Sequence, residues 1–70
     1  MDKSRPKARL LTPQETADWL QISVETLRTW RDRRLNLPFV KVGSLVRYDP
    51  DDVEAYISRR RVPVRRVINN

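Results

Sequence analysis

Two short helical patterns separated by only three residues constrain this chain more than any other feature of its sequence. The first runs from Pro13 to Leu20, and the second from Val24 to about Arg34. The linking residues, Gln21-Ile22-Ser23, are too few to let the helices lie apart, so the helices must cross and pack together. The sequence therefore predicts a helix, a tight turn and a second helix.

Helix-start signals and apolar spacing support this interpretation. Thr12 is expected to cap the first helix, with Pro13 at its first position and Glu15 completing a capping box. Ser23 is expected to cap the second helix. The residues predicted to face the interior are Thr16, Ala17, Leu20, Ile22, Val24, Leu27 and Trp30. The two helices should therefore share one small core, with Trp19 at its margin.

Asn36 is a candidate for left-handed backbone just beyond the second helix. A β-hairpin is predicted farther along the chain, around Gly43, and its two strands could pair in either of two registers. A two-residue loop at Gly43-Ser44 would pair Val40 with Arg47, which puts a charge beside a valine predicted to be buried.

A three-residue loop, Gly43-Ser44-Leu45, instead gathers the apolar residues on one face and sends Lys41 and Arg47 to the other. Its pairs are Val42 with Val46 and Val40 with Tyr48. We therefore expect the three-residue loop, a basic outer face, and an exposed tip at Ser44 and Leu45.

A third helix is predicted from Pro50 to about Arg60 or Arg61. Asp49 is expected to cap it, and the acidic residues that follow favour the positive end of the helix. Pro63 prevents its continuation. Its inward residues are Val53, Tyr56 and Ile57.

The charge balance narrows the range of partners. The 70 residues carry 15 Lys and Arg against 9 Asp and Glu, a net charge of +6 with a sequence pI near 10.8. Such an excess favours a polyanion, either nucleic acid or an anionic membrane, and an adaptor for an acidic protein is a further alternative. No apolar run approaches membrane-spanning length. Nucleic acid is therefore the expected partner, and a membrane is not.

The residue types that carry most enzyme chemistry are missing. The sequence has no Cys and no His, which removes thiol and imidazole catalysis and Cys/His zinc sites. Helix capping explains the acidic pair Asp51-Asp52, and a single glycine cannot build a phosphate loop. We therefore expect no enzyme activity, no metal and no cofactor.

The two ends of the chain differ in composition from its middle. Residues 1–9 combine basic side chains with a proline and no apolar periodicity, which predicts a disordered basic arm and not a signal peptide. Residues 62–70 are predicted to form a flexible basic and apolar tail. The folded domain is expected over residues 10–61.

The residues that carry a family resemblance lie in a fixed order, and they are Leu11-Thr12, Ala17, Leu20, Ile22-Ser23, Thr26-Leu27, Trp30, Pro38, Val42-Gly43, Val46-Arg47-Tyr48 and Val53. Together they resemble the excisionase branch of the MerR-like winged helix-turn-helix domains, over residues 10–61. The resemblance implies a mainly α fold with a small β-hairpin: a helix-turn-helix, a two-stranded wing and a third helix.

The same resemblance implies a function. Excisionases, also called recombination directionality factors, bind and bend attachment-site DNA and direct a tyrosine-type integrase toward excision of a phage or mobile element. Relatives of the domain act as transcription regulators, which is the alternative. The implied partners are double-stranded DNA, an integrase and further copies of the chain on the same DNA, in the cytoplasm of a bacterial host.

The second helix is expected to enter the major groove of DNA. Arg28 is the main candidate for a guanine contact, because its guanidinium can donate to O6 and N7 together. Glu25 either accepts from cytosine or orients an arginine. Ser23 either caps the helix alone or also helps its first N–H groups to hold a phosphate. The other candidates on this helix are Thr26, Thr29 and Arg33.

The hairpin and the end of the chain supply further cations. Lys41 and Arg47 are expected to lie along the minor groove, with Ser44 at the tip; the alternative for Arg47 is a salt bridge to Asp51 or Glu54. The tail candidates for contact with phosphates, a neighbouring subunit or the integrase are Arg59, Arg60, Arg61, Arg65 and Arg66.

Overall fold

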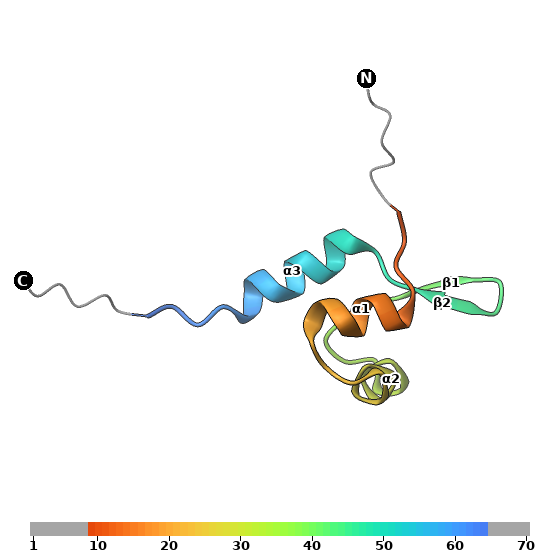
Figure 1. Cartoon of the computed structure of the whole chain (residues 1–70), viewed down its shortest axis with the longest axis horizontal. Helices are drawn as coiled ribbons and strands as arrows, with labels where there is room; N and C mark the ends of the chain where they lie inside the picture. Colours follow the sequence, from red (N-terminus) through yellow and green to blue (C-terminus); the bar gives the residue numbers. More distant parts are fainter. Residues whose placement is uncertain (1–8, 65–70) are drawn as a thin grey trace, which may run out of the picture.

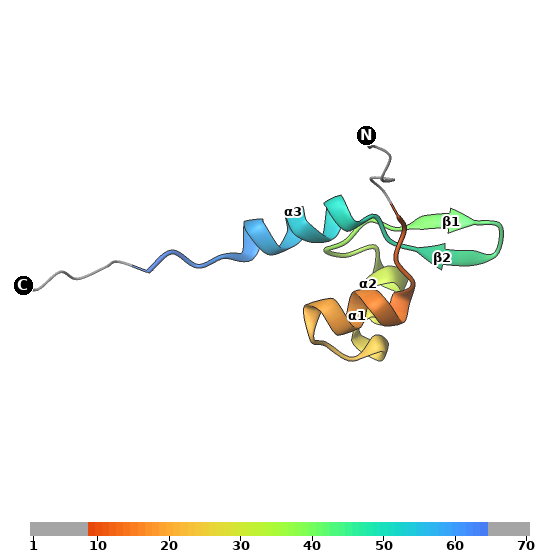
Figure 2. The same ribbon diagram turned by 45° about the horizontal axis from the view of Figure 1, so that its top comes forward.

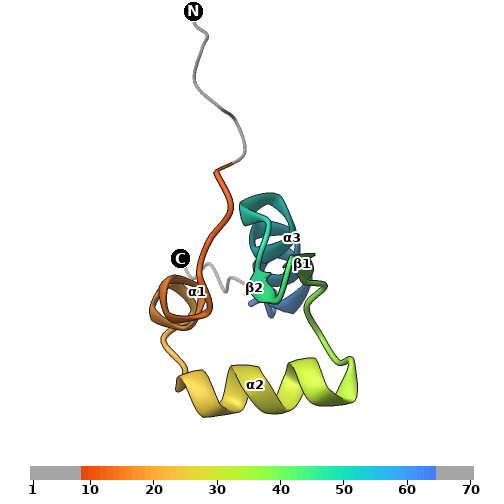
Figure 3. The same ribbon diagram turned by 90° about the vertical axis from the view of Figure 1, so that its right-hand side faces the viewer.

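Three helices and two strands follow one another along the chain. The structure, a computed structural model, describes residues 9–64. Its elements are α1 (Pro13–Leu20), α2 (Val24–Arg33), β1 (Val40–Val42), β2 (Leu45–Arg47) and α3 (Pro50–Arg60). In Figure 1 the hairpin projects to one side of the first two helices and α3 to the other. Figure 3 shows α2 lying crosswise to α1 and α3.

The predicted helix starts are confirmed. The Glu15 N–H donates to the Thr12 hydroxyl at 3.1 Å, and the Thr12 N–H donates to Glu15 Oε1 at 2.9 Å, which completes the capping box. At the start of α2, Ser23 Oγ accepts from the Thr26 N–H at 3.0 Å. Asp49 caps α3. Each start is therefore set by side chains next to it in the sequence.

Left-handed backbone ends both helices of the first pair. Gln21 follows α1 with a φ of 58°, and Arg34 follows α2 with a φ of 56°. Asn36, with a φ of 62°, is left-handed as predicted. A left-handed residue lets the chain leave a helix while its N–H still reaches the last carbonyls. The chain therefore turns sharply at these positions.

The core is small and draws on all three helices and the hairpin. Its fully buried side chains are Thr16, Ala17, Leu27, Tyr48 and Val53. Leu37, in the loop after α2, is also buried, which the sequence pattern did not predict. The prediction for Val24 is wrong, since it is 36% exposed. A helical side chain leans over the turn that precedes it, and Val24 is the first residue of α2.

Contacts between distant residues join the elements. The Leu11 N–H donates to the Tyr48 carbonyl at 2.8 Å, and the Tyr48 N–H donates to the Leu11 carbonyl at 2.9 Å, so the segment before α1 is tied to the end of the hairpin. The rings of Trp30 on α2 and Tyr56 on α3 lie 5.5 Å apart between centroids. These contacts attach the hairpin and α3 to the two-helix unit.

The predicted hairpin register is wrong. The loop has two residues, and the observed pairs are Val42 with Leu45, Lys41 with Val46 and Val40 with Arg47. Gly43 has a φ of 65°, and glycine with positive φ at the first loop position is typical of a two-residue type II′ turn. The prediction relied on burial of the valines, but the hairpin extends past the helices (Figure 2), so turn geometry sets the register.

The two faces of the hairpin therefore differ from the prediction. Lys41 shares a face with Val46, and Arg47 shares the opposite face with Val40. The two cations do not form a common basic face. Val40, Val42 and Leu45 are exposed by 37%, 48% and 53%, and no core covers them.

A helix-turn-helix followed by a two-stranded wing and a third helix is a winged helix-turn-helix, as predicted. Within residues 9–64, every helix is too short or too polar to cross a lipid bilayer.

Candidate nucleic-acid interface

The outward side of α2 carries the polar side chains that the sequence analysis assigned to it. These exposed residues are Glu25, Thr26, Arg28, Thr29, Asp32 and Arg33. Arg28 Nη1 lies 3.5 Å from Glu25 Oε1, one helical turn away, and the two side chains are 51% and 78% exposed. Glu25 is therefore close enough to orient Arg28, one of the two roles considered for it, and an exposed pair of this kind is held weakly enough to open toward a ligand.

The amino end of α2 is arranged around Ser23. Its Oγ accepts the Thr26 N–H and lies 2.9 Å from the Thr26 hydroxyl. The capping role of Ser23 is thus confirmed, whereas contact with a phosphate stays a prediction. The first N–H groups of a helix lack intrahelical partners and favour anions, so this end of α2 suits a phosphate.

A groove of about 330 Å³ separates α2 from the wing. Arg31, Asp32 and Arg34 line it from α2 and its cap, and Lys41 and Val46 line it from the hairpin. Lys41 therefore lies next to α2, and Arg28 is exposed on the outward side of that helix. The groove thus gathers the cations Arg31, Arg34 and Lys41 with one acidic residue, Asp32, and this excess of positive charge suits a polyanion.

Arg31 links α2 to Tyr48, the residue that follows the wing, and this contact was not predicted. Its Nη1 donates to the buried Tyr48 hydroxyl at 3.1 Å. Arg34 lies over the Phe39 ring, with its guanidinium carbon 6.0 Å from the centroid. The Arg31–Tyr48 contact has no local sequence signal, because it joins residues 17 positions apart.

Arg47 lies on the other face of the wing, near α1. Its Nη1 donates to the Val46 carbonyl at 2.7 Å. The pKa of the Glu15 carboxyl is lowered from its ordinary value, chiefly by the hydrogen bond from the Thr12 N–H, and the charges of Arg9 and Arg47 lower it further. The charge of Arg47 therefore acts on the start of α1, and Arg47 lies on the opposite face of the hairpin from Lys41.

The remaining candidates lie apart from the groove. Ser44 is exposed at the wing tip. Arg59, Arg60 and Arg61 are exposed at the end of α3 that points away from the wing in Figure 1, and Arg60 lies over the Tyr56 ring at 5.5 Å. Arg65 and Arg66 lie outside the described residues.

The two tryptophans have different surroundings. Trp30 packs against the core beside Tyr56, as predicted. Trp19 is 40% exposed and lines a hollow of about 300 Å³ with Ile57. Neither lies on the outward side of α2, so this surface offers no aromatic platform of the kind that single-stranded nucleic acids stack on.

Comparison with known proteins gives one match. The model of the family described as "Helix-turn-helix domain" matches residues 10–61. No curated protein and no solved structure matches the chain.

Proposed function

The chain belongs to the helix-turn-helix domain family, a family of DNA-binding domains that includes excisionase-like proteins, and on this premise we propose that it binds double-stranded DNA with α2 in the major groove. The observation that carries the proposal is the exposed Arg28–Glu25 pair on the outward side of α2, beside a groove lined by Arg31, Arg34 and Lys41.

The residues at the start and on the outward side of α2 have distinct proposed roles. Arg28 reads a guanine edge, and Glu25 holds its guanidinium in place until DNA arrives. Arg33 and the start of α2 at Ser23 contact phosphates. Thr26 and Thr29 contact a thymine methyl or a phosphate.

The corrected hairpin register changes the proposed role of the wing. Lys41 and the exposed tip residue Ser44 meet the DNA backbone together with α2. Arg47 lies on the opposite face, so it cannot share a phosphate with Lys41. The wing should thus contribute fewer charges to DNA binding than the sequence pattern predicted.

Two substitutions of Arg28 test the proposal. Arg28→Ala should weaken binding to a preferred duplex by about 1–3 kcal/mol and relax the base preference at one position. Arg28→Lys keeps the charge but loses the bidentate fork, so it should relax the preference with a smaller loss of affinity. Fluorescence anisotropy with duplexes selected from a random library measures both.

Salt provides the control for this experiment. The affinity of each variant should fall steeply between about 50 and 200 mM salt, because phosphate contacts release counterions. Unchanged affinity of Arg28→Ala for every duplex would instead favour an adaptor for an acidic protein, or a different docking face.

We further propose that the DNA-bound protein acts as an excisionase with a tyrosine-type integrase in a bacterial cytoplasm, and that copies assemble side by side on the attachment site. The motif order over residues 10–61 supports this role. A transcription regulator that uses the same surface is the second candidate. An excision assay with purified integrase and attachment-site DNA separates the two: excision that proceeds equally well without the protein rules out the first.

A further inference from the structure

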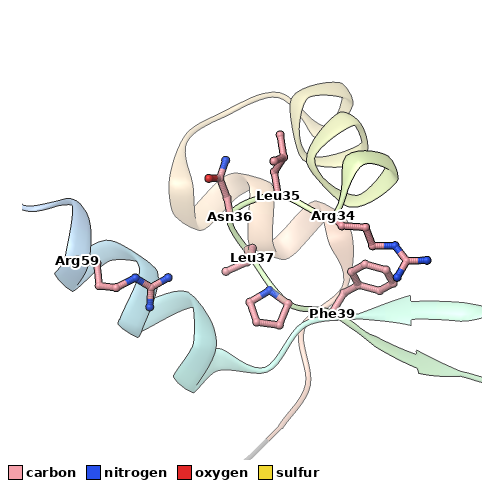
Figure 4. A pocket seen from close by; sticks show the side chains of 7 residues that line it. Arg34, Leu35, Asn36, Leu37, Phe39 and Arg59 are labelled. Carbon is pink, nitrogen blue, oxygen red and sulfur yellow. The ribbon is translucent and has the colours of Figure 1, made fainter.

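Another hollow adjoins the proposed DNA-binding surface, where the loop between α2 and β1 passes α3. Its volume is about 540 Å³. Figure 4 shows the loop crossing it, with Arg59 extending from α3 at one end and Arg34 beside Phe39 at the other. We call this hollow the loop–α3 cleft.

The cleft combines an apolar lining with positive charge. Leu35, Leu37, Pro38 and Phe39 supply apolar surface, and Leu35 is 44% exposed. Arg34, whose guanidinium lies over the Phe39 ring, and Arg59 are the two cationic residues of the lining, and within residues 9–64 the lining includes no acidic side chain. The groove beside Lys41 differs, because Asp32 lines it.

The shape of the cleft is preset by the fold. Leu37 is buried in the core, and its N–H donates to the Leu35 carbonyl at 2.6 Å across the left-handed Asn36. The loop is thus held in one conformation between α2 and β1. A site that needs no ordering on binding loses less conformational entropy.

We propose that the loop–α3 cleft binds a short acidic and apolar segment of a partner protein. An apolar side chain of that segment rests on Leu35 and Phe39, and acidic residues on either side pair with Arg34 and Arg59. Charge complementarity favours this occupant. A nucleic-acid backbone would satisfy the arginines but leave the apolar lining uncovered.

The cleft adjoins the groove beside Lys41 but extends in a different direction. Figure 4 shows α2 end-on and the wing to one side of the loop, with α3 on the other side. The cleft and the groove share Arg34 and Phe39, whereas the rest of the cleft lining lies toward α3, away from the proposed DNA contacts of Arg28 and Lys41. The inference goes beyond the proposed function, because it gives a DNA-binding chain a separate site for protein.

A peptide titration tests the proposal on the full chain. The probe is the blocked peptide Glu-Asp-Leu-Phe-Asp-Glu, followed by amide chemical shifts in ¹⁵N-labelled protein. Shifts should centre on Leu35, Asn36 and Leu37, with a dissociation constant in the millimolar range. A peptide with serines in place of leucine and phenylalanine should bind about tenfold more weakly, because it buries no apolar side chain.

Substitutions in the cleft provide a second test of the proposal. Leu35→Ser and Arg59→Gln should each weaken peptide binding severalfold, whereas Leu45→Ser, which alters a leucine of similar exposure on the wing, should not. Leu35→Ser should bind duplex DNA as the unmodified chain does, and its dispersed amide spectrum would show that it folds.

Three results would overturn the proposal. They are the absence of shifts at several millimolar peptide, equal binding of the serine peptide, and displacement of the peptide by duplex DNA, which would make the cleft a phosphate site. The two proposals can fail separately: a chain that binds the peptide but no duplex loses the proposed function and keeps the cleft.

Discussion

Single side chains determine where the helices begin. Thr12 and Glu15 exchange hydrogen bonds at the start of α1, and Ser23 caps α2. Each of these contacts spans three residues, so the sequence pattern predicts it correctly. Each helix is only a few turns long, and isolated helices of this length are marginal in water. The caps are therefore an important part of what stabilises them.

Glu15 makes the capping box of α1 sensitive to pH. Because the pKa of Glu15 is lowered in the folded chain, chiefly by the hydrogen bond from the Thr12 N–H, the ionised carboxylate stabilises the fold above its ordinary pKa of 4.5. This contribution is lost as pH falls through the lowered pKa. We predict that Glu15→Gln destabilises the fold at pH 7 and flattens the decline in stability below about pH 4.5.

Urea denaturation at several pH values measures this effect. Glutamine can still accept the Thr12 N–H, so the variant removes the charge and keeps the geometry. Parallel stability curves for the two proteins from pH 7 to pH 3 would show that the carboxylate does not contribute in this way.

The register of the hairpin could not be predicted from its apolar pattern. The pattern favoured a three-residue loop that would bury four apolar residues, yet Val40 and Val42 are exposed and the loop has two residues. A buried face fixes register strongly, but a hairpin that projects past the core has no such face. Gly43 then sets the register of the hairpin, because its positive φ allows the tight two-residue turn.

Gly43→Ala tests that assignment. No heavy atom lies within 4 Å of the position a Cβ would take, so the substitution adds no clash. It should still destabilise the protein by about 1–2 kcal/mol, because alanine resists positive φ. Urea denaturation measures the loss, and Ser44→Ala, at the neighbouring loop position, should change stability by less than about 0.5 kcal/mol. Equal effects at the two positions would contradict the turn assignment.

The stability of the whole molecule depends on a handful of buried side chains. Domains of this size have a net stability of only about 3–5 kcal/mol. Leu27 is fully buried at the centre of α2. Tyr48, at the end of the wing, bonds to Leu11 through its backbone and to Arg31 through its hydroxyl. Loss of one core side chain should therefore affect the entire fold and not one element.

Leu27→Ala should cost about 2–5 kcal/mol and leave much of the protein unfolded at 25 °C. Val24→Ala, one turn earlier on the same helix, should change stability by less than about 1 kcal/mol, because Val24 is exposed. Circular dichroism of the two variants tests the prediction. If DNA binds the folded chain, adding a preferred duplex should restore helicity to Leu27→Ala. A folded Leu27→Ala variant without DNA would contradict the assigned core.

Local signals in the sequence determined the helices, their caps, the left-handed Asn36 and the outward arc that carries Arg28, since each depends on residues within one helical turn.

Tertiary contacts decided which loop residue is buried, which residues pair between elements and which way the faces of the hairpin point. Leu37 is buried because the loop folds against α3 and the wing, and Arg31 meets Tyr48 across 17 positions of sequence. The sequence around Lys41 and Arg47 is compatible with two pairing registers of the hairpin strands. The turn at Gly43 selects the register that places Lys41 beside α2 and Arg47 on the opposite face of the hairpin. Side-chain periodicity states which residues share a face, but not where that face points when no core lies beneath it.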